Sequence, residues 1–326
     1  MIAGFIFSLL VSVLFATYAV PRKYSKQHVV LYTMWMGIAY FMGAIILISI
    51  IWGFGFEEPE NLINPWHLLT VLRGLIWVLG MAAYNRAIDK IGLTRFNQWK
   101  NIQGPVGSLL ILFVVADMVV GIKVLFLILG MVVMFCSALF FQVKTDAELG
   151  KQHVSNGLTA PEGISARKNT KSGIALALLS GVCFGVSALL NSIVSKPAIV
   201  GNVFIFAQLL YHSASLIVFS ALVYMIMGNK PSTLKQRLQD IGKVSKTTWL
   251  PVMAGAMFLV ATLLTIYSYR MIPNAVAWSI TQLNVFWTIL IGVFIFKEVN
   301  YKQHGLRLSA GVLMAVGACV LLFWAM

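Results

Sequence analysis

Two stretches of the sequence decide the fold: Gly92-Leu-Thr-Arg-Phe-Asn-Gln-Trp-Lys-Asn-Ile-Gln-Gly104 and Pro273-Asn-Ala-Val-Ala-Trp-Ser-Ile-Thr-Gln-Leu-Asn-Val285. They align without a gap as far as Asp117 and Glu298, so each is an apolar segment with a polar beginning and an acid at its end. Gly4 to Phe15 aligns in the same way with Gly173 to Phe184. The chain therefore contains one set of segments twice, a pattern typical of transporters built from repeated groups of membrane helices.

The composition is that of a membrane protein. Of 326 residues, 60% are hydrophobic and only 10% are charged, and the mean hydropathy is +0.88, far from the values of an ordinary soluble domain. An apolar stretch of about 20 residues can cross a bilayer as one helix. The sequence has ten such stretches: Ile2–Val20, Val29–Trp52, Trp66–Ala87, Ile91–Val115, Val124–Val143, Gly173–Val194, Asn202–Met227, Trp249–Tyr269, Ile272–Phe296 and Leu306–Met326. We therefore predict an all-α polytopic membrane protein with ten transmembrane helices.

The net charge of +14 is unevenly distributed over the predicted loops. Alternate loops hold nearly all Lys and Arg residues, and the opposite side holds only Lys123, Lys196 and Arg270. The positive-inside rule makes the basic side cytoplasmic and places both termini outside. The basic loops follow the first and third helices of the first half but the second and fourth helices of the second half, as two inverted repeats of five helices require.

The predicted organisation is a first repeat over 1–143, a polar cytoplasmic linker over 144–171 and a second, inverted repeat over 172–326. The sequence has no phosphate-cradling loop, nucleophile elbow or metal-binding His motif, so nothing in it supports an ATP-driven pump, an enzyme, a metal site or a cofactor. The basic residues follow the membrane topology and do not indicate nucleic-acid binding.

Several quoted stretches resemble a known family. Three stretches are similar to bacterial glucose, ribose and L-rhamnose uptake proteins. They are Phe15-Ala-Thr-Tyr-Ala-Val-Pro-Arg-Lys-Tyr-Ser-Lys26, Gly80-Met-Ala-Ala-Tyr-Asn-Arg-Ala-Ile-Asp-Lys-Ile-Gly-Leu93 and Gly173 to Pro197. These sugar porters are a branch of the drug/metabolite transporter superfamily. The resemblance implies alternating access by two pseudo-symmetric halves, a central cavity, and uptake that is often driven by protons.

Polar side chains inside the apolar segments are the candidates for that cavity, because a charge at a helix centre costs about 2.5–3.5 kcal/mol unless it faces protein or water. On the fourth and ninth segments they recur at three- and four-residue spacing and so share a face. Amides and hydroxyls on two facing helices suit a polyhydroxyl ligand. The alternative is that they only bond helix to helix. The candidate substrate-binding residues are Asn97, Lys100, Asn101, Gln103, Trp278, Thr281, Gln282 and Asn284, with Arg73 and Asn85 on the third helix.

Energy coupling has fewer candidates in the sequence. The acids lie in loops or at predicted helix ends, so none is placed as a proton carrier within the membrane. His212, near the middle of the seventh helix, is the deeply placed group that titrates near neutrality, although a structural role is an alternative. Asp117 and Glu298, at matching helix ends, suggest gating or fold roles.

The sequence thus predicts a secondary transporter of the cell (inner) membrane that takes up a small polar metabolite, most naturally a sugar. Its partners would be that substrate, the lipid bilayer and protons. One alternative is an exporter or exchanger of a small organic anion, because Arg73, Arg95 and Lys100 lie at membrane depth without an evident counter-ion. A membrane scaffold or sensor is disfavoured, since it would not need matched polar residues in both repeats.

Overall fold

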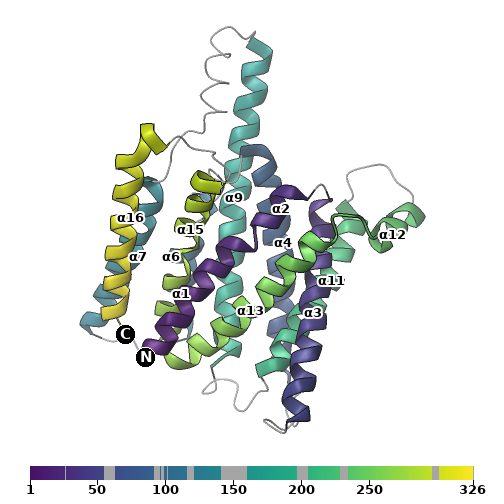
Figure 1. Cartoon of the computed structure of the whole chain (residues 1–326), viewed down its shortest axis with the longest axis horizontal. Helices are drawn as coiled ribbons and strands as arrows, with labels where there is room; N and C mark the ends of the chain where they lie inside the picture. The colour runs from purple at the N-terminus through teal and green to yellow at the C-terminus, as the bar shows by residue number, and fades with distance from the viewer. Residues whose placement is uncertain are drawn as a thin grey trace.

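The structure is a computed structural model that describes residues 1–25, 27–54, 63–91, 96, 99–100, 102–115, 121–140, 160–196, 205–227, 234–295 and 301–325. All regular secondary structure in these residues is helical (Figure 1). The helices are α1 (Ile2–Thr17), α2 (Val20–Tyr24), α3 (Val29–Gly53), α4 (His67–Ile91), α6 (Gln103–Val114), α7 (Ile122–Phe140), α9 (Ala160–Val194), α11 (Ile205–Met227), α12 (Leu234–Gly242), α13 (Trp249–Met271), α14 (Asn274–Thr281), α15 (Asn284–Leu290), the π-helix η2 (Ile291–Ile295) and α16 (Tyr301–Trp324).

The helices confirm a polytopic membrane protein. In the described part of the chain, seven helices are long and apolar enough to cross a membrane: α1, α3, α4, α9, α11, α13 and α16. Helices α6 and α7 are apolar but shorter. The ninth predicted segment is divided among α14, α15 and η2. Ten uninterrupted spans are therefore not confirmed.

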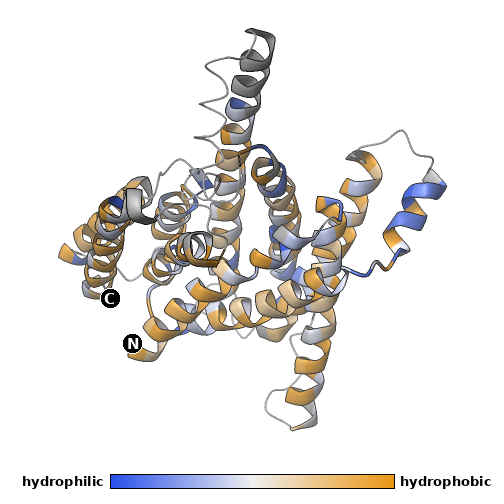
Figure 2. Cartoon of the chain, turned by 45° about the horizontal axis from the view of Figure 1, so that its top comes forward, coloured by the Kyte–Doolittle hydropathy of each residue, from blue (hydrophilic) through white to orange (hydrophobic). Residues whose placement is uncertain are grey.

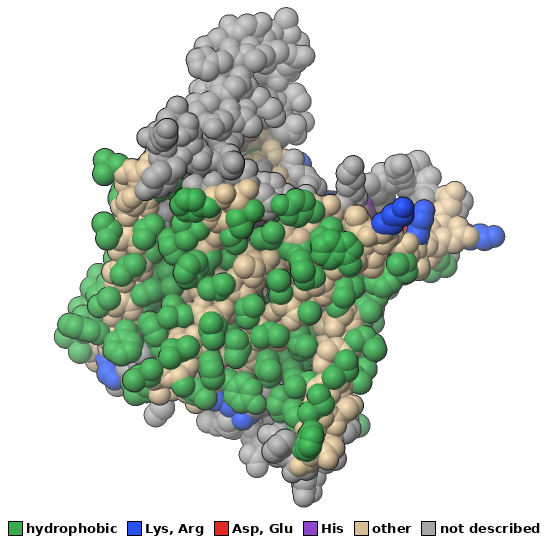
Figure 3. Space-filling view, viewed as in Figure 1, with side chains coloured by type: hydrophobic (Ala, Val, Ile, Leu, Met, Phe, Trp, Pro, Cys, Tyr) green, Lys and Arg blue, Asp and Glu red, His purple; other side chains and the backbone are tan. Residues whose placement is uncertain are grey.

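The outside of the molecule is suited to lipid. Hydrophobic side chains cover the face in Figure 3, and Figure 2 shows the long helices as mainly hydrophobic, whereas α12 is hydrophilic. Ile46 on α3, Val132 on α7 and Leu313 on α16 are all more than half exposed. An exposed apolar surface of this extent is unfavourable in water and favourable in a bilayer, where helices satisfy their own backbone groups.

Proline residues mark two of the helix boundaries. Pro21 lies in the first turn of α2, where a missing backbone N–H is tolerated, and separates this short helix from α1. Pro273 is the N-cap of α14. A turn at Gln282 and Leu283 then separates α14 from α15.

Helix α9 begins at Ala160, earlier than the predicted start at Gly173, so part of the predicted linker is helical.

The packing of the helices brings the two halves of the chain together. The main contacts pair α4 with α9, α3 with α11, α1 with α13, α7 with α16, and α6 with both α9 and α14. One apolar core lies around α3, α4, α11 and α13, and a second around α6, α7, α14 and α16. Both chain ends lie on one face of the molecule, away from α2 and α12 (Figure 1). The two cores meet at the centre, where the cavity lies.

Candidate functional site

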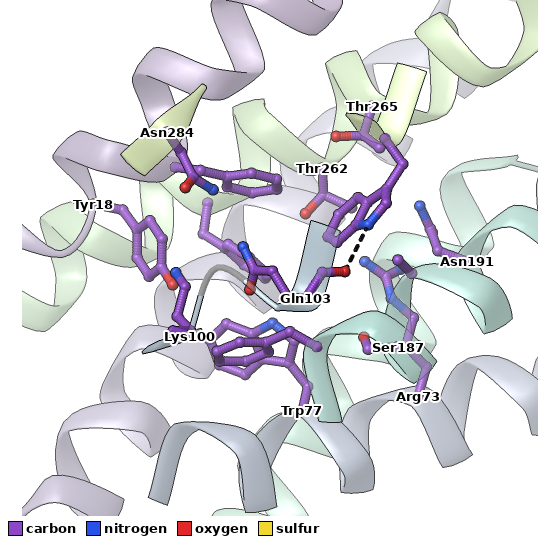
Figure 4. Close-up of a pocket in the computed structure, with 15 residues that line it drawn as sticks. Tyr18, Arg73, Trp77, Lys100, Gln103, Ser187, Asn191, Thr262, Thr265 and Asn284 are labelled. Atoms are coloured by element: carbon purple, nitrogen blue, oxygen red, sulfur yellow. Dashed lines mark hydrogen bonds between the residues drawn. The ribbon is translucent and has the colours of Figure 1, made fainter. Parts of the chain in front are cut away.

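A cavity of about 560 Å³, counting the space that opens to solvent, lies between the two cores. Both halves of the chain contribute to its lining, through α1, α4, α6, α9, α13, α14 and α15, and also through Lys100, which precedes α6 (Figure 4). The lining residues are Phe15, Tyr18, Arg73, Trp77, Lys100, Gln103, Phe184, Ser187, Ala188, Asn191, Phe258, Thr262, Thr265, Trp278 and Asn284. Aromatic rings and polar groups alternate around one volume, as in a small-molecule site.

Helices α6 and α14 approach each other closely beside this cavity. The side chain of Gln103 donates from Nε2 to Oε1 of Gln282 at 2.8 Å, and the indole of Trp278 donates from Nε1 to the backbone oxygen of Gln103 at 3.2 Å. Two glycines permit this approach. A Cβ at Gly104 would lie 2.8 Å from Cγ of Gln282, and one at Gly107 would overlap Trp278. Helices α6 and α14, which belong to the two segments that align in sequence, thus lie side by side, at what we call the α6–α14 seam.

Two cations face the cavity. Lys100 is 5% exposed and Arg73 is 7% exposed. The ammonium of Lys100 lies 5.4 Å from the ring centroid of Tyr84 and 5.6 Å from that of Phe184, distances at which a cation is attracted to an aromatic face. None of the described residues that line the cavity is acidic. The site is therefore electropositive, and a buried charge without a counter-ion is costly.

The predicted site residues divide into three groups. Arg73, Lys100, Gln103, Trp278 and Asn284 line the cavity, as expected, and their role in binding stays a prediction. Asn97, Asn101, Asp117 and Glu298 lie outside the described residues.

The third group does not line the cavity. The hydroxyl of Thr281 donates to the backbone oxygen of Trp278 at 2.6 Å, and Gln282 is engaged in the α6–α14 seam. The side chain of Asn85 accepts a hydrogen bond from Nε of Arg22 at 3.1 Å and donates to the backbone oxygen of Met81 at 2.9 Å. Gln282 and Asn85 thus bond helix to helix, which is the alternative that the sequence left open for polar residues, whereas Thr281 bonds within α14.

Several lining residues were not predicted from the sequence. Phe15 and Phe184 end the aligned stretches that begin at Gly4 and Gly173, and both line the cavity. The same alignment continues to Tyr18 and Ser187, which also line it. The sequence repeat was the signal that could have found these four. Asn191, Thr262 and Thr265 are polar residues within apolar helices, which is the weaker signal that identified Asn284.

His212 lies outside the cavity. Its ring is fully buried on α11, with Nδ1 3.5 Å from the hydroxyl of Tyr40. Its ring centroid lies 6.4 Å from that of Trp77 and 5.9 Å from that of Phe258. Since both of these rings line the cavity, His212 lies one layer of side chains behind it.

Comparisons with known proteins agree with this picture. A family model described as "Sugar transport protein" matches residues 42–325. A crystal structure of another protein superimposes with a TM-score of 0.63 over 98% of this chain and 96% of its own, at 11% sequence identity. That likeness concerns the fold alone. A comparison with curated proteins gives no match.

Proposed function

Because the chain belongs to the sugar transport protein family and folds as a polytopic membrane protein, we propose that it is a secondary transporter that moves a sugar across the cell membrane by alternating access. The observation that carries this proposal is the central cavity, where polar and aromatic side chains from both halves of the chain converge. Sites of this kind at the interface of two repeats are where many secondary transporters bind their substrates.

The helix contacts support two five-helix repeats. We match α1 with α9, α3 with α11, α4 with α13, α6 with α14 and α15, and α7 with α16. Under this exchange, the α4–α9 contact becomes α13–α1, α6–α9 becomes α14–α1, and α3–α13 becomes α11–α4; all of these occur. The exchange leaves three contacts unchanged, because each joins two matched helices: α3–α11, α7–α16 and α6–α14. A pseudo-twofold axis through the cavity would produce such a pattern.

The cavity lining supports the same symmetry. Phe15 matches Phe184 and Tyr18 matches Ser187 by the alignment of the first and sixth segments, and all four line the cavity.

Two further matched pairs come from the other repeated segments. The offset that aligns Gly92 with Pro273 also aligns Trp77 with Phe258 and Gln103 with Asn284. From these four pairs, the first half would supply three aromatic rings and one amide to the ligand, and the second half two aromatic rings, one hydroxyl and one amide. Rocking of two such halves about a fixed site is the basis of alternating access.

The chemistry of the lining fits a sugar. The apolar faces of sugar rings can pack against flat aromatic side chains, and Trp77 and Trp278 line the cavity. The amides of Gln103 and Asn284 and the hydroxyl of Ser187 can exchange hydrogen bonds with sugar hydroxyls.

The orientation follows from charge. Basic helix α12 and the end of α2 lie on the face opposite both chain ends (Figure 1). We propose that this basic face is cytoplasmic and that both termini lie outside. For proton coupling we propose His212, because Asp240, the acid whose side chain the structure describes, is exposed on α12 and not near the cavity.

Uptake of radiolabelled neutral and acidic sugars into proteoliposomes, with and without a proton gradient, tests the proposal. We expect uptake above protein-free liposomes and a strong loss in Asn284→Ala, which removes a cavity amide. Arg270→Gln, at the exposed end of α13, is the matched control and should transport normally. Absence of uptake for every sugar would contradict the proposed function.

A further inference from the structure

We propose that the substrate is an acidic sugar, a polyhydroxylated ring or chain that carries a carboxylate, and that Arg73 binds this carboxylate. This inference rests on the proposed function and names the substrate class. Three observations carry it: the state of Arg73, an unsatisfied amide oxygen in the same cavity, and the balance of charge in the lining.

The guanidinium of Arg73 is buried and aimed at the cavity. It comes from α4, and in Figure 4 it points inward on the side of Ser187 and Asn191. Its Nε, a hydrogen-bond donor, is buried without a hydrogen-bond partner. A planar guanidinium with a free donor edge matches a carboxylate with two parallel hydrogen bonds.

The cavity also contains a buried oxygen that lacks a partner. Oδ1 of Asn191, which lines the cavity together with Thr262, is buried without a hydrogen bond. An amide oxygen only accepts, so Asn191 needs a donor, and a carboxylate alone cannot supply one. Sugar hydroxyls can donate to Asn191 and exchange a hydrogen bond with Thr262. Together with Arg73, this set matches a ligand that carries both hydroxyls and a carboxylate.

The charges in the lining favour the same ligand. Lys100 and Arg73 approach the cavity from opposite sides, and the described lining has no acid (Figure 4). The rings of Tyr84, Phe96 and Phe184 partly compensate Lys100, all within about 6 Å of its ammonium. No ring contact of this kind compensates Arg73 among the described residues. A neutral sugar would leave the guanidinium without a counter-ion, whereas a carboxylate would neutralise it at the moment of binding.

Matched ligands separate charge from shape. Binding of hexuronates and aldonates to the purified protein, each beside its neutral amide, can be followed by tryptophan fluorescence, since Trp77 and Trp278 line the cavity. We expect the affinity of each acid that binds to be at least about tenfold higher than that of its amide, because a hydrogen bond to a charged group is stronger than one to a neutral group. Arg73→Gln should bring the ratio close to one, and Arg270→Gln should leave it unchanged.

Each outcome decides between the claims. Equal affinity for acid and amide, with neutral sugars still transported, would overturn the role of Arg73 and leave the proposed function standing. Failure of acids, amides and neutral sugars to bind or to be transported would overturn both. A carboxylate without hydroxyls, such as acetate, that binds as tightly as the acidic sugars would overturn the sugar part. If Arg73→Gln does not fold, the acid-to-amide ratio of the wild-type protein and of Arg73→Lys decides.

Discussion

Replacing Gly107 by alanine tests the close approach of α6 and α14 on which one wall of the cavity depends. A Cβ at this position would overlap Nε1 of Trp278 and lie 2.9 Å from its Cδ1. The indole must move, and its hydrogen bond to the backbone oxygen of Gln103 would break.

The magnitude follows from three opposing effects. Overpacking a tight interface costs about 1–3 kcal/mol, and the lost hydrogen bond costs about 0.5–1.5 kcal/mol. Alanine in place of glycine inside a helix returns about 0.5–1 kcal/mol. We therefore expect Gly107→Ala to lower the free energy of unfolding by about 2 kcal/mol.

Gly317→Ala is the matched control, because nothing lies within 4 Å of a Cβ at Gly317 on α16. It should be neutral or stabilising by up to about 1 kcal/mol. Thermal unfolding of both purified variants in the same detergent compares them directly. The closeness of α6 and α14 would be refuted if Gly107→Ala were as stable as Gly317→Ala. Sugar uptake by Gly107→Ala should also fall, since the displaced indole lines the cavity.

Further variants separate structure, binding and topology. Gln282→Ala should lower stability by about 1–3 kcal/mol, because it leaves the buried amide of Gln103 without its acceptor; Asn284→Ala should lower uptake while thermal unfolding stays near wild type. Lys100→Met keeps the apolar stem among the aromatic rings but removes a buried charge, so it should raise stability by about 1 kcal/mol or more while transport falls. Unchanged transport in that variant would make Lys100 a structural residue. Phosphatase fused to either terminus should be active outside the cell, and a bright fluorescent fusion that matures only in the cytoplasm would reverse the topology.

Sequence periodicity located the α6–α14 seam, but two side chains that it predicted in the cavity, those of Thr281 and Gln282, do not line it. Thr281 was expected to share the cavity-facing stripe with Asn284, and Gln282 to lie alongside it, on the assumption of one continuous helix over Ile272–Phe296. The structure breaks that helix at Gln282 and Leu283, which interrupts the 3.6-residue register. The sequence has neither glycine nor proline at the break, so nothing local predicted it.

The helix that follows α4 shows a different limit. A span over Ile91–Val115 was predicted. Helix α4 continues to Ile91, the described residues Phe96, Trp99 and Lys100 are helical, and α6 begins at Gln103. Gly104 and Pro105 could have indicated this start, because proline is tolerated in the first turn of a helix. Polar residue type predicted Arg73, Lys100 and Asn284 in the cavity. It could not separate them from Asn85, whose partner Arg22 becomes a neighbour only through the fold.

Solute counterflow tests the central claim of alternating access most directly. Proteoliposomes are preloaded with an unlabelled sugar that the protein binds and then diluted into a trace of the labelled sugar, with no ion gradient. A carrier that exposes its cavity to one side at a time predicts transient accumulation of label above equilibrium, and Asn284→Ala should reduce it. Label that only equilibrates, or that never enters, would contradict alternating access.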